Sequence, residues 1–260
     1  MIDFIKKYFG TLLFFTLVGL VGGFFTGLFL LETYPADIRA QLLDELGALG
    51  DVGVDASIII AIITALQSAG YGLLLGAVGI HLAKRIGLWR DERSITARPL
   101  LISVVTSAIG GLLMILPDML FFNGYSEAIA ESYAAKPSAV YILACVTYGA
   151  VIEEVMLRLF AMSLVAFLLH RFIEKGEGTP STAVLVGANL ISALLFAAGH
   201  LPATIMTIGS SPLIILRCFL LNGGLGLLFG YLYRRHGLRY AMIAHGGCHI
   251  ISKLIWVLFI

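Results

Sequence analysis

Charged side chains are scarce in this chain of 260 residues: Asp, Glu, Lys and Arg make up 13% of it, against 59% for hydrophobic residues. Soluble domains carry about 25% charged residues, so the composition excludes an ordinary soluble protein and predicts an integral membrane protein. A formal net charge of +1 gives no basic field for nucleic acid. Cysteine is also rare, and Cys145, Cys218 and Cys248 all fall in apolar stretches, which excludes a disulfide framework.

Long apolar stretches fill most of the chain, and each is long enough for a hydrocarbon core of about 30 Å, which needs about 20 helical residues. They span residues 11–31, 57–83, 99–117, 138–170, 182–208, 212–233 and 239–259. We therefore predict an all-α, polytopic transmembrane helix bundle. The stretch 138–170 either runs unbroken or divides near Arg158 into two shorter helices, so seven to eight spans are expected.

The charges between these stretches alternate in sign along the chain. Acidic residues dominate 32–56 and 118–137, whereas Lys and Arg dominate 84–98, 171–175 and 234–239. The positive-inside rule then predicts a multi-pass protein with a cytoplasmic N-terminus, in the plasma membrane if the source is prokaryotic. The acidic residues counted are Glu32, Asp37, Asp44, Glu45, Asp51, Asp55, Asp118, Glu127 and Glu131, and the basic ones include Lys84, Arg85, Arg90, Arg93 and Arg98.

Apolar residues recur at helical spacing within the first acidic loop, at Ile38, Leu42 and Leu46. This pattern predicts a helix within residues 35–49 that lies flat on the outer surface.

Small residues recur every four positions in the first span, at Gly19, Gly23 and Gly27. Such a stripe lets a second helix approach closely. The partner is either another helix of the same chain, the favoured interpretation, or a second copy in a homodimer.

Adjacent carboxylates interrupt the fourth apolar stretch at Glu153 and Glu154. Ionisable groups are unfavourable at membrane depth, so a pair implies a polar cavity or a charged partner. Glu154 and Arg158 are four residues apart and are expected to form an ion pair on one helix face. Glu153 then faces a different neighbour and is suited to general acid–base chemistry.

Histidines occupy two later apolar stretches, at His200 and at His245 and His249. His200 comes level with Glu153 only if its helix continues past Pro202 to about residue 208 as a kinked helix. His245 and His249 share one helix face, a spacing that is used by metal ligands. Glu153 and the three histidines therefore form either a proton-transfer site or a zinc site.

Three segments together resemble the CPBP family of intramembrane CAAX-type endopeptidases. Its Glu-Glu-x-x-x-Arg motif is matched by Glu153, Glu154 and Arg158, and its Phe-x-x-x-His motif by Phe196 and His200. The stretch from Gly226 to His245 is similar to the last two helices of the family. On this resemblance residues 1–137 are N-terminal membrane helices without a motif, and residues 138–260 are the catalytic core.

The resemblance implies a glutamate-type protease without a cofactor, with zinc as the alternative. Glu153 and His200 would activate a water that attacks a peptide carbonyl, with Glu154 beside them in the motif. His245 and the residue one turn later would stabilise the oxyanion. The family usually has Asn or Asp at that later position, whereas this chain has His249, which still offers a hydrogen-bond donor.

The sequence therefore predicts an intramembrane endopeptidase whose partners are membrane lipid and a membrane-associated peptide, a prenylated CAAX-type tail being one candidate. The alternative is a non-catalytic relative that acts as a membrane scaffold, a bacteriocin-immunity factor or a regulator. A proton-coupled transporter uses the same residue types but ranks last, because no internal inverted repeat is visible.

Overall fold

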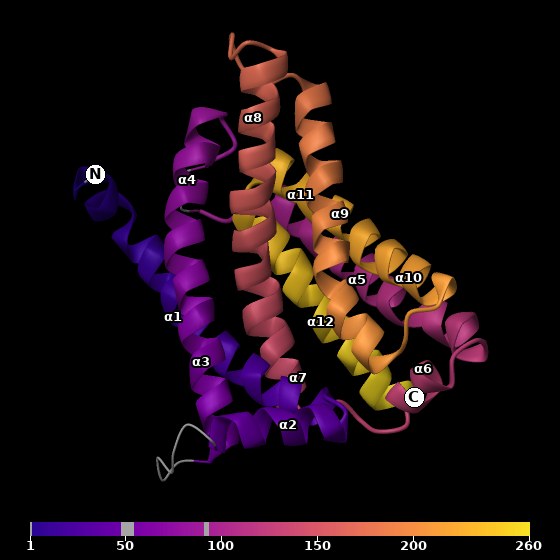
Figure 1. Cartoon of the computed structure of the whole chain (residues 1–260). Coiled ribbons are helices and arrows are strands. Elements are labelled where there is room, and N and C mark those ends of the chain that lie inside the picture. The colour runs from indigo at the N-terminus through magenta and orange to yellow at the C-terminus, as the bar shows by residue number, and fades with distance from the viewer. Residues whose placement is uncertain (1, 48–54, 91–93) are drawn as a thin grey trace.

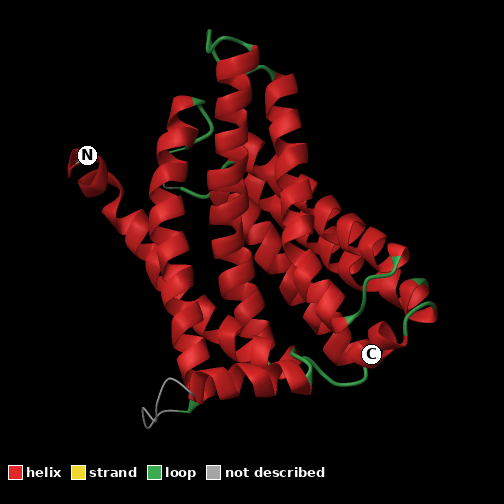
Figure 2. Ribbon diagram, in the orientation of Figure 1, coloured by secondary structure: helices red, strands yellow, loops and turns green. Residues whose placement is uncertain are grey.

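The computed structural model describes residues 2–47, 55–90 and 94–260, and these residues form an all-helical bundle without strands (Figure 2). Asp51 and Arg93, counted above among the loop charges, lie outside the described residues. The predicted fold class is confirmed. Figure 1 shows long helices lying side by side, joined by short turns at their ends.

Six helices of the described residues are long and apolar enough to cross a membrane. They are α1 (Ile2–Thr33), α3 (Ala56–Gly70) continued by η1 (Tyr71–Leu75) and α4 (Gly76–Arg85), α5 (Ala97–Leu120), α9 (Thr182–Thr207), α10 (Pro212–Cys218) continued by η5 (Phe219–Gly223) and α11 (Gly224–His236), and α12 (Leu238–Phe259).

A further long helix carries the carboxylate pair. It runs without interruption through α7 (Ala139–Ala144), η3 (Cys145–Glu153), η4 (Val155–Met162) and α8 (Ser163–Ile173). The break near Arg158 that would have given an eighth span is therefore absent. The segments η3 and η4 are π-helical, a wider winding that is frequent at functional sites.

Short helices connect the long ones at one end of the bundle: α2 (Ala36–Gly47), η2 (Phe122–Gly124) and α6 (Glu127–Ser132). The flat helix predicted within residues 35–49 is present as α2, which lies across the ends of the long helices in Figure 1. Serine caps begin several helices, because the side chains of Ser138, Ser181 and Ser211 each accept a hydrogen bond from a backbone N–H of the first turn.

The glycine stripe of α1 packs against α3 of the same chain. A Cβ at Gly19 would lie 2.5 Å from the Ser68 carbonyl oxygen, and one at Gly27 would lie 2.6 Å from Ala61 Cα. Gly23 is equally close to the Thr64 carbonyl. This stripe is therefore buried within one chain, which corrects the homodimer alternative built on Gly19, Gly23 and Gly27.

The main core joins the two halves of the sequence. Phe15 of α1, Ile80 of α4, Leu159 of η4 and Phe229 of α11 belong to one buried apolar cluster. On the other side of the bundle α5 packs on α12, where the Ser103 hydroxyl donates to the Tyr240 carbonyl at 3.0 Å. The motif-free first three spans are thus part of the framework that holds the motif-bearing helices.

Candidate active site

The two adjacent carboxylates have opposite surroundings. Glu154 is fully buried, whereas the side chain of Glu153 is 19% exposed. Glu154 Oε2 lies 3.4 Å from Arg158 Nε, and Glu154 Oε1 lies 2.9 Å from His245 Nδ1. Glu154 is therefore enclosed between a guanidinium and an imidazole, and Glu153 is the carboxylate that reaches open space.

Arg158 is held in place by aromatic rings and by a backbone carbonyl. Its guanidinium lies 4.7 Å from the centre of the Phe196 ring and 5.6 Å from that of Phe229. One of its terminal nitrogens donates to the Gly226 carbonyl at 3.3 Å. Cation–π contacts of this kind are stronger when water is excluded, so Arg158 joins three helices behind the cavity described below.

His200 is brought to the site by the unbroken course of α9 through Pro202 to Thr207. Its Nδ1 lies 2.8 Å from the Phe196 carbonyl. Because a carbonyl only accepts, Nδ1 carries the hydrogen, and in the neutral ring Nε2 is left as an acceptor. In that tautomer His200 offers Nε2 as an acceptor to the cavity that it lines.

The α12 histidines stack on one another, with ring centres 5.0 Å apart. His245 also stacks on Phe229 at 4.5 Å, and its Nε2 lies 3.8 Å from Glu153 Oε2. The His245 ring is therefore held between the two carboxylates, with Nδ1 facing Glu154 and Nε2 facing Glu153.

A cavity of about 270 Å³, here called the intramembrane cavity, receives these side chains. Its polar lining consists mainly of Glu153, His200, His245, His249 and Asn222, and its apolar lining includes Phe29, Leu30, Met114 and Leu225. The structure thus brings Glu153 and the three predicted histidines to one space, and it places Glu154 and Arg158 outside that lining.

The residues that the zinc alternative names are not arranged as a metal site in the structure. Within the part of the chain that the structure describes, no three His, Cys, Asp or Glu side chains are grouped as metal ligands. Both nitrogens of His245 already face carboxylates. The absence of a cofactor stays a prediction.

Sequence reasoning missed Gly149, one turn before Glu153. A Cβ at this position would lie 3.2 Å from His249 Nε2 and 4.0 Å from Glu153 Oε2. The absent side chain leaves room for the His249 ring beside Glu153. The signal was available, since a glycine one turn before an intramembrane carboxylate marks a close approach.

Lys253, one turn after His249, was also missed. It is 5% exposed, and its ammonium donates to the Tyr141 hydroxyl at 3.0 Å and lies 4.3 Å from the Tyr141 ring centre. Tyr141 lines the intramembrane cavity. A lysine in an apolar helix is itself a signal of function or of a buried partner.

A comparison with known protein families finds one family model that matches this part of the chain. Residues 135–251 match the model of a family described as type II CAAX prenyl endopeptidase Rce1-like. Over this region, which is less than half of the chain, the sequence is similar to the Rce1-like family. The match includes every predicted site residue, from Glu153 to His249, and it excludes the first three spans. This similarity supports a CAAX-type intramembrane endopeptidase as the general class. No curated protein and no solved structure matches the chain.

Proposed function

We propose that this Rce1-like chain is an intramembrane endopeptidase in which Glu153 acts as general base on a water molecule. One observation supports this above all: Glu153 opens into the intramembrane cavity, while its neighbour Glu154 is enclosed by Arg158 and His245. Adjacent carboxylates in different environments have different roles. Glu153 is free to exchange a proton, and Glu154 holds His245 in position.

The mechanism uses His245 with a hydrogen on each ring nitrogen. Nδ1–H donates to Glu154 Oε1 at 2.9 Å, and Nε2–H is directed toward the cavity, which His245 lines.

The reaction follows from these positions. Glu153 removes a proton from water as the water oxygen attacks the peptide carbonyl carbon, and His200 Nε2 orients that water by accepting its other hydrogen. The negative charge that develops on the carbonyl oxygen is stabilised by His245 Nε2–H and by His249. Glu153 then gives its proton to the leaving nitrogen, the C–N bond breaks, and a carboxylic acid and an amine are released.

The substrate class follows from the cavity walls. Apolar side chains from α1 and α5 line the cavity together with the polar residues, a lining that suits a peptide held at membrane depth. We propose a membrane-associated peptide, with a prenylated CAAX-type tail as the first substrate to test.

Replacement of Glu153 by Gln is the decisive experiment. We expect cleavage to fall by about 10³-fold or more, because general-base and electrostatic terms are both lost. The assay uses purified protein in proteoliposomes with a farnesylated CAAX peptide and with the same peptide lacking the prenyl group. Glu127→Gln is the matched control, since Glu127 is an exposed carboxylate of α6.

Two results separate the possibilities. Unchanged cleavage in Glu153→Gln would rule out the mechanism. No cleavage by the wild type, together with a lowered Tm of the variant, would favour the non-catalytic scaffold or regulator. A comparison of membrane proteomes between cells with wild-type and variant protein then identifies natural substrates, and metal analysis of the purified protein tests the metal-free assignment.

A further inference from the structure

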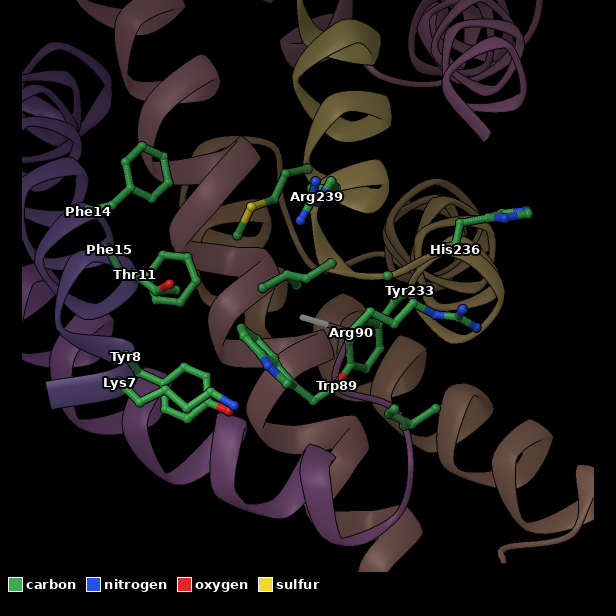
Figure 3. Close-up of a pocket in the computed structure, with 14 residues that line it drawn as sticks. Lys7, Tyr8, Thr11, Phe14, Phe15, Trp89, Arg90, Tyr233, His236 and Arg239 are labelled. Atoms are coloured by element: carbon green, nitrogen blue, oxygen red, sulfur yellow. The ribbon is translucent and has the colours of Figure 1, made fainter. Parts of the chain in front are cut away.

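A second, larger cavity of about 370 Å³ lies between α1, the segment after α4, and the turn from α11 to α12 (Figure 3). It shares no lining residue with the intramembrane cavity. We call it the basic cavity, because Lys7, Arg90, His236 and Arg239 are in its lining. No step of the proposed reaction uses it.

The basic cavity lies at the level where membrane spans begin and end. Lys7 and Tyr8 are near the start of the span 3–33, His236 ends the span 212–236, and Arg239 is in the first turn of the span 238–259. Trp89 and Tyr8 pack edge to face at 5.7 Å. Cations and amphipathic aromatics together are typical of the boundary between head groups and acyl chains.

A buried hydroxyl without a partner lies in this lining. Tyr8 is 3% exposed, and its hydroxyl has no hydrogen-bond partner in the structure. Buried tyrosine hydroxyls usually find an acceptor. The ammonium groups of Lys7 and Lys84 lie 5.3 Å and 5.2 Å from the Tyr8 ring centre, so the missing acceptor would sit among positive charges. An anionic oxygen fits that position.

The first turn of α12 adds backbone donors. Gly237, Leu238 and Arg239 line the basic cavity, and α12 begins at Leu238 without a side-chain cap. The N-terminus of a 22-residue helix carries partial positive charge and unpaired N–H groups. Figure 3 shows Arg239 at this turn, across the cavity from Lys7 and Tyr8.

The remaining wall is apolar. Phe14, Phe15, Leu88 and Met242 line the same space, and Phe14 is 51% exposed on the outer surface of α1. A free inorganic anion gains nothing from contact with an apolar wall, whereas an acyl chain is stabilised by burying apolar surface against it. Basic pockets between transmembrane helices are known to hold anionic lipid head groups.

We infer that the basic cavity binds an anionic phospholipid of the surrounding leaflet. The phosphate lies between Arg90, Arg239, the Tyr8 hydroxyl and the first turn of α12, and one acyl chain lies along Phe14 and Met242. This site is separate from the proposed peptidase site, and its test does not depend on cleavage.

The experiment titrates delipidated protein in detergent with phosphatidylglycerol and, separately, with phosphatidylcholine, and follows bound lipid by native mass spectrometry. The Arg90→Gln/Arg239→Gln double variant should bind phosphatidylglycerol about tenfold more weakly. Its weak binding of phosphatidylcholine should not change. The matched control is Arg234→Gln/Arg235→Gln, which removes the same charge from the same end of the molecule outside the cavity lining, and it should retain the wild-type affinity.

Tyr8→Phe tests the site independently of net charge and keeps the ring packed. It should weaken phosphatidylglycerol binding by about threefold to tenfold with an unchanged Tm, and it decides the question if the double arginine variant fails to fold. Equal losses in the two arginine pairs would overturn the proposal, since binding would then reflect diffuse charge. Displacement of the lipid by inorganic phosphate would also overturn it in favour of a free-anion site.

Discussion

Two buried carboxylate–arginine pairs of the described residues differ in how completely they are hydrogen-bonded. Asp118 of α5 receives a bond of 2.6 Å from Arg217 Nε, a second from the Arg217 terminal nitrogen, and one of 2.9 Å from the Tyr133 hydroxyl. In the other pair, Glu154 Oε2 and Arg158 Nε face each other at 3.4 Å without a hydrogen bond. The first pair has both carboxylate oxygens satisfied, whereas the second does not.

The difference distinguishes a structural pair from a functional one. Fully bonded ionic groups hold helices in register, and here they join α5, α10 and Tyr133, the residue that follows α6. The Glu154 pair instead lies against His245, and it is His245 that lines the intramembrane cavity. Unsatisfied buried polar atoms in a native protein call for an explanation, and proposed catalysis by Glu153 and His245 supplies it.

Asp118→Asn should have the largest effect on stability. Removing this charge leaves Arg217 without its partner, which for buried pairs lowers the free energy of unfolding by about 3–5 kcal/mol. Thermal and denaturant unfolding in detergent measure this loss. Cleavage per folded molecule should be unchanged, and a specific loss of turnover would contradict the structural assignment.

Glu154→Gln should have the opposite profile. The amide keeps the shape of the side chain but accepts from His245 Nδ1–H more weakly than the carboxylate does, so cleavage per folded molecule should fall by at least about tenfold. The cleavage rate is normalised to folded protein from the same preparation. If turnover were normal and only stability fell, Glu154 would have a structural role like that of Asp118.

Gly149→Ala tests whether the position of the His249 ring in the intramembrane cavity matters for cleavage. The added Cβ would displace the His249 ring, so we expect a loss of cleavage of about threefold with little change in Tm. Gly187→Ala is the control, because its Cβ would meet only Leu169 Cδ1 at 3.8 Å. Equal activity in the two variants would show that the position of His249 is unimportant.

The smallest effect is expected at Glu174, outside the spans. Hydrogen bonds from Ser181 and His170 lower the pKa of Glu174 from its ordinary value of 4.5. A lowered pKa stabilises the fold above that ordinary value, and the contribution is lost as the pH falls through the folded-state pKa. The Tm difference between wild type and Glu174→Gln should therefore shrink below pH 4.5, and thermal unfolding at a series of pH values measures it.

Apolar length predicted the helices well, because lipid requires every span to satisfy its own backbone. The stretch 182–208 is α9 at Thr182–Thr207, and 239–259 is α12 at Leu238–Phe259. The first span is longer than expected, at Ile2–Thr33, since a helix does not stop where its apolar run ends. Hydropathy detects the membrane core and not the last helical turn.

Contacts between residues far apart in the chain could not be predicted from the sequence pattern. Asp118 was counted as a loop charge, yet it is fully buried and paired with Arg217, which lies 99 residues away. Local spacing predicts Glu154 with Arg158 because one helix holds both. Local spacing does not say which helix packs against α5. For the same reason it could not predict the contact between Lys253 and Tyr141.

Helices α1, α11 and α12 each line both cavities. On α1, Phe15 borders the basic cavity and Thr26 borders the intramembrane cavity, a separation of roughly 16 Å along the helix. A chemist therefore has two points of attack on this molecule. A compound lodged at the lower-numbered end of α1 would leave the reaction chamber unobstructed, and a peptide-like blocker of that chamber would not displace bound lipid.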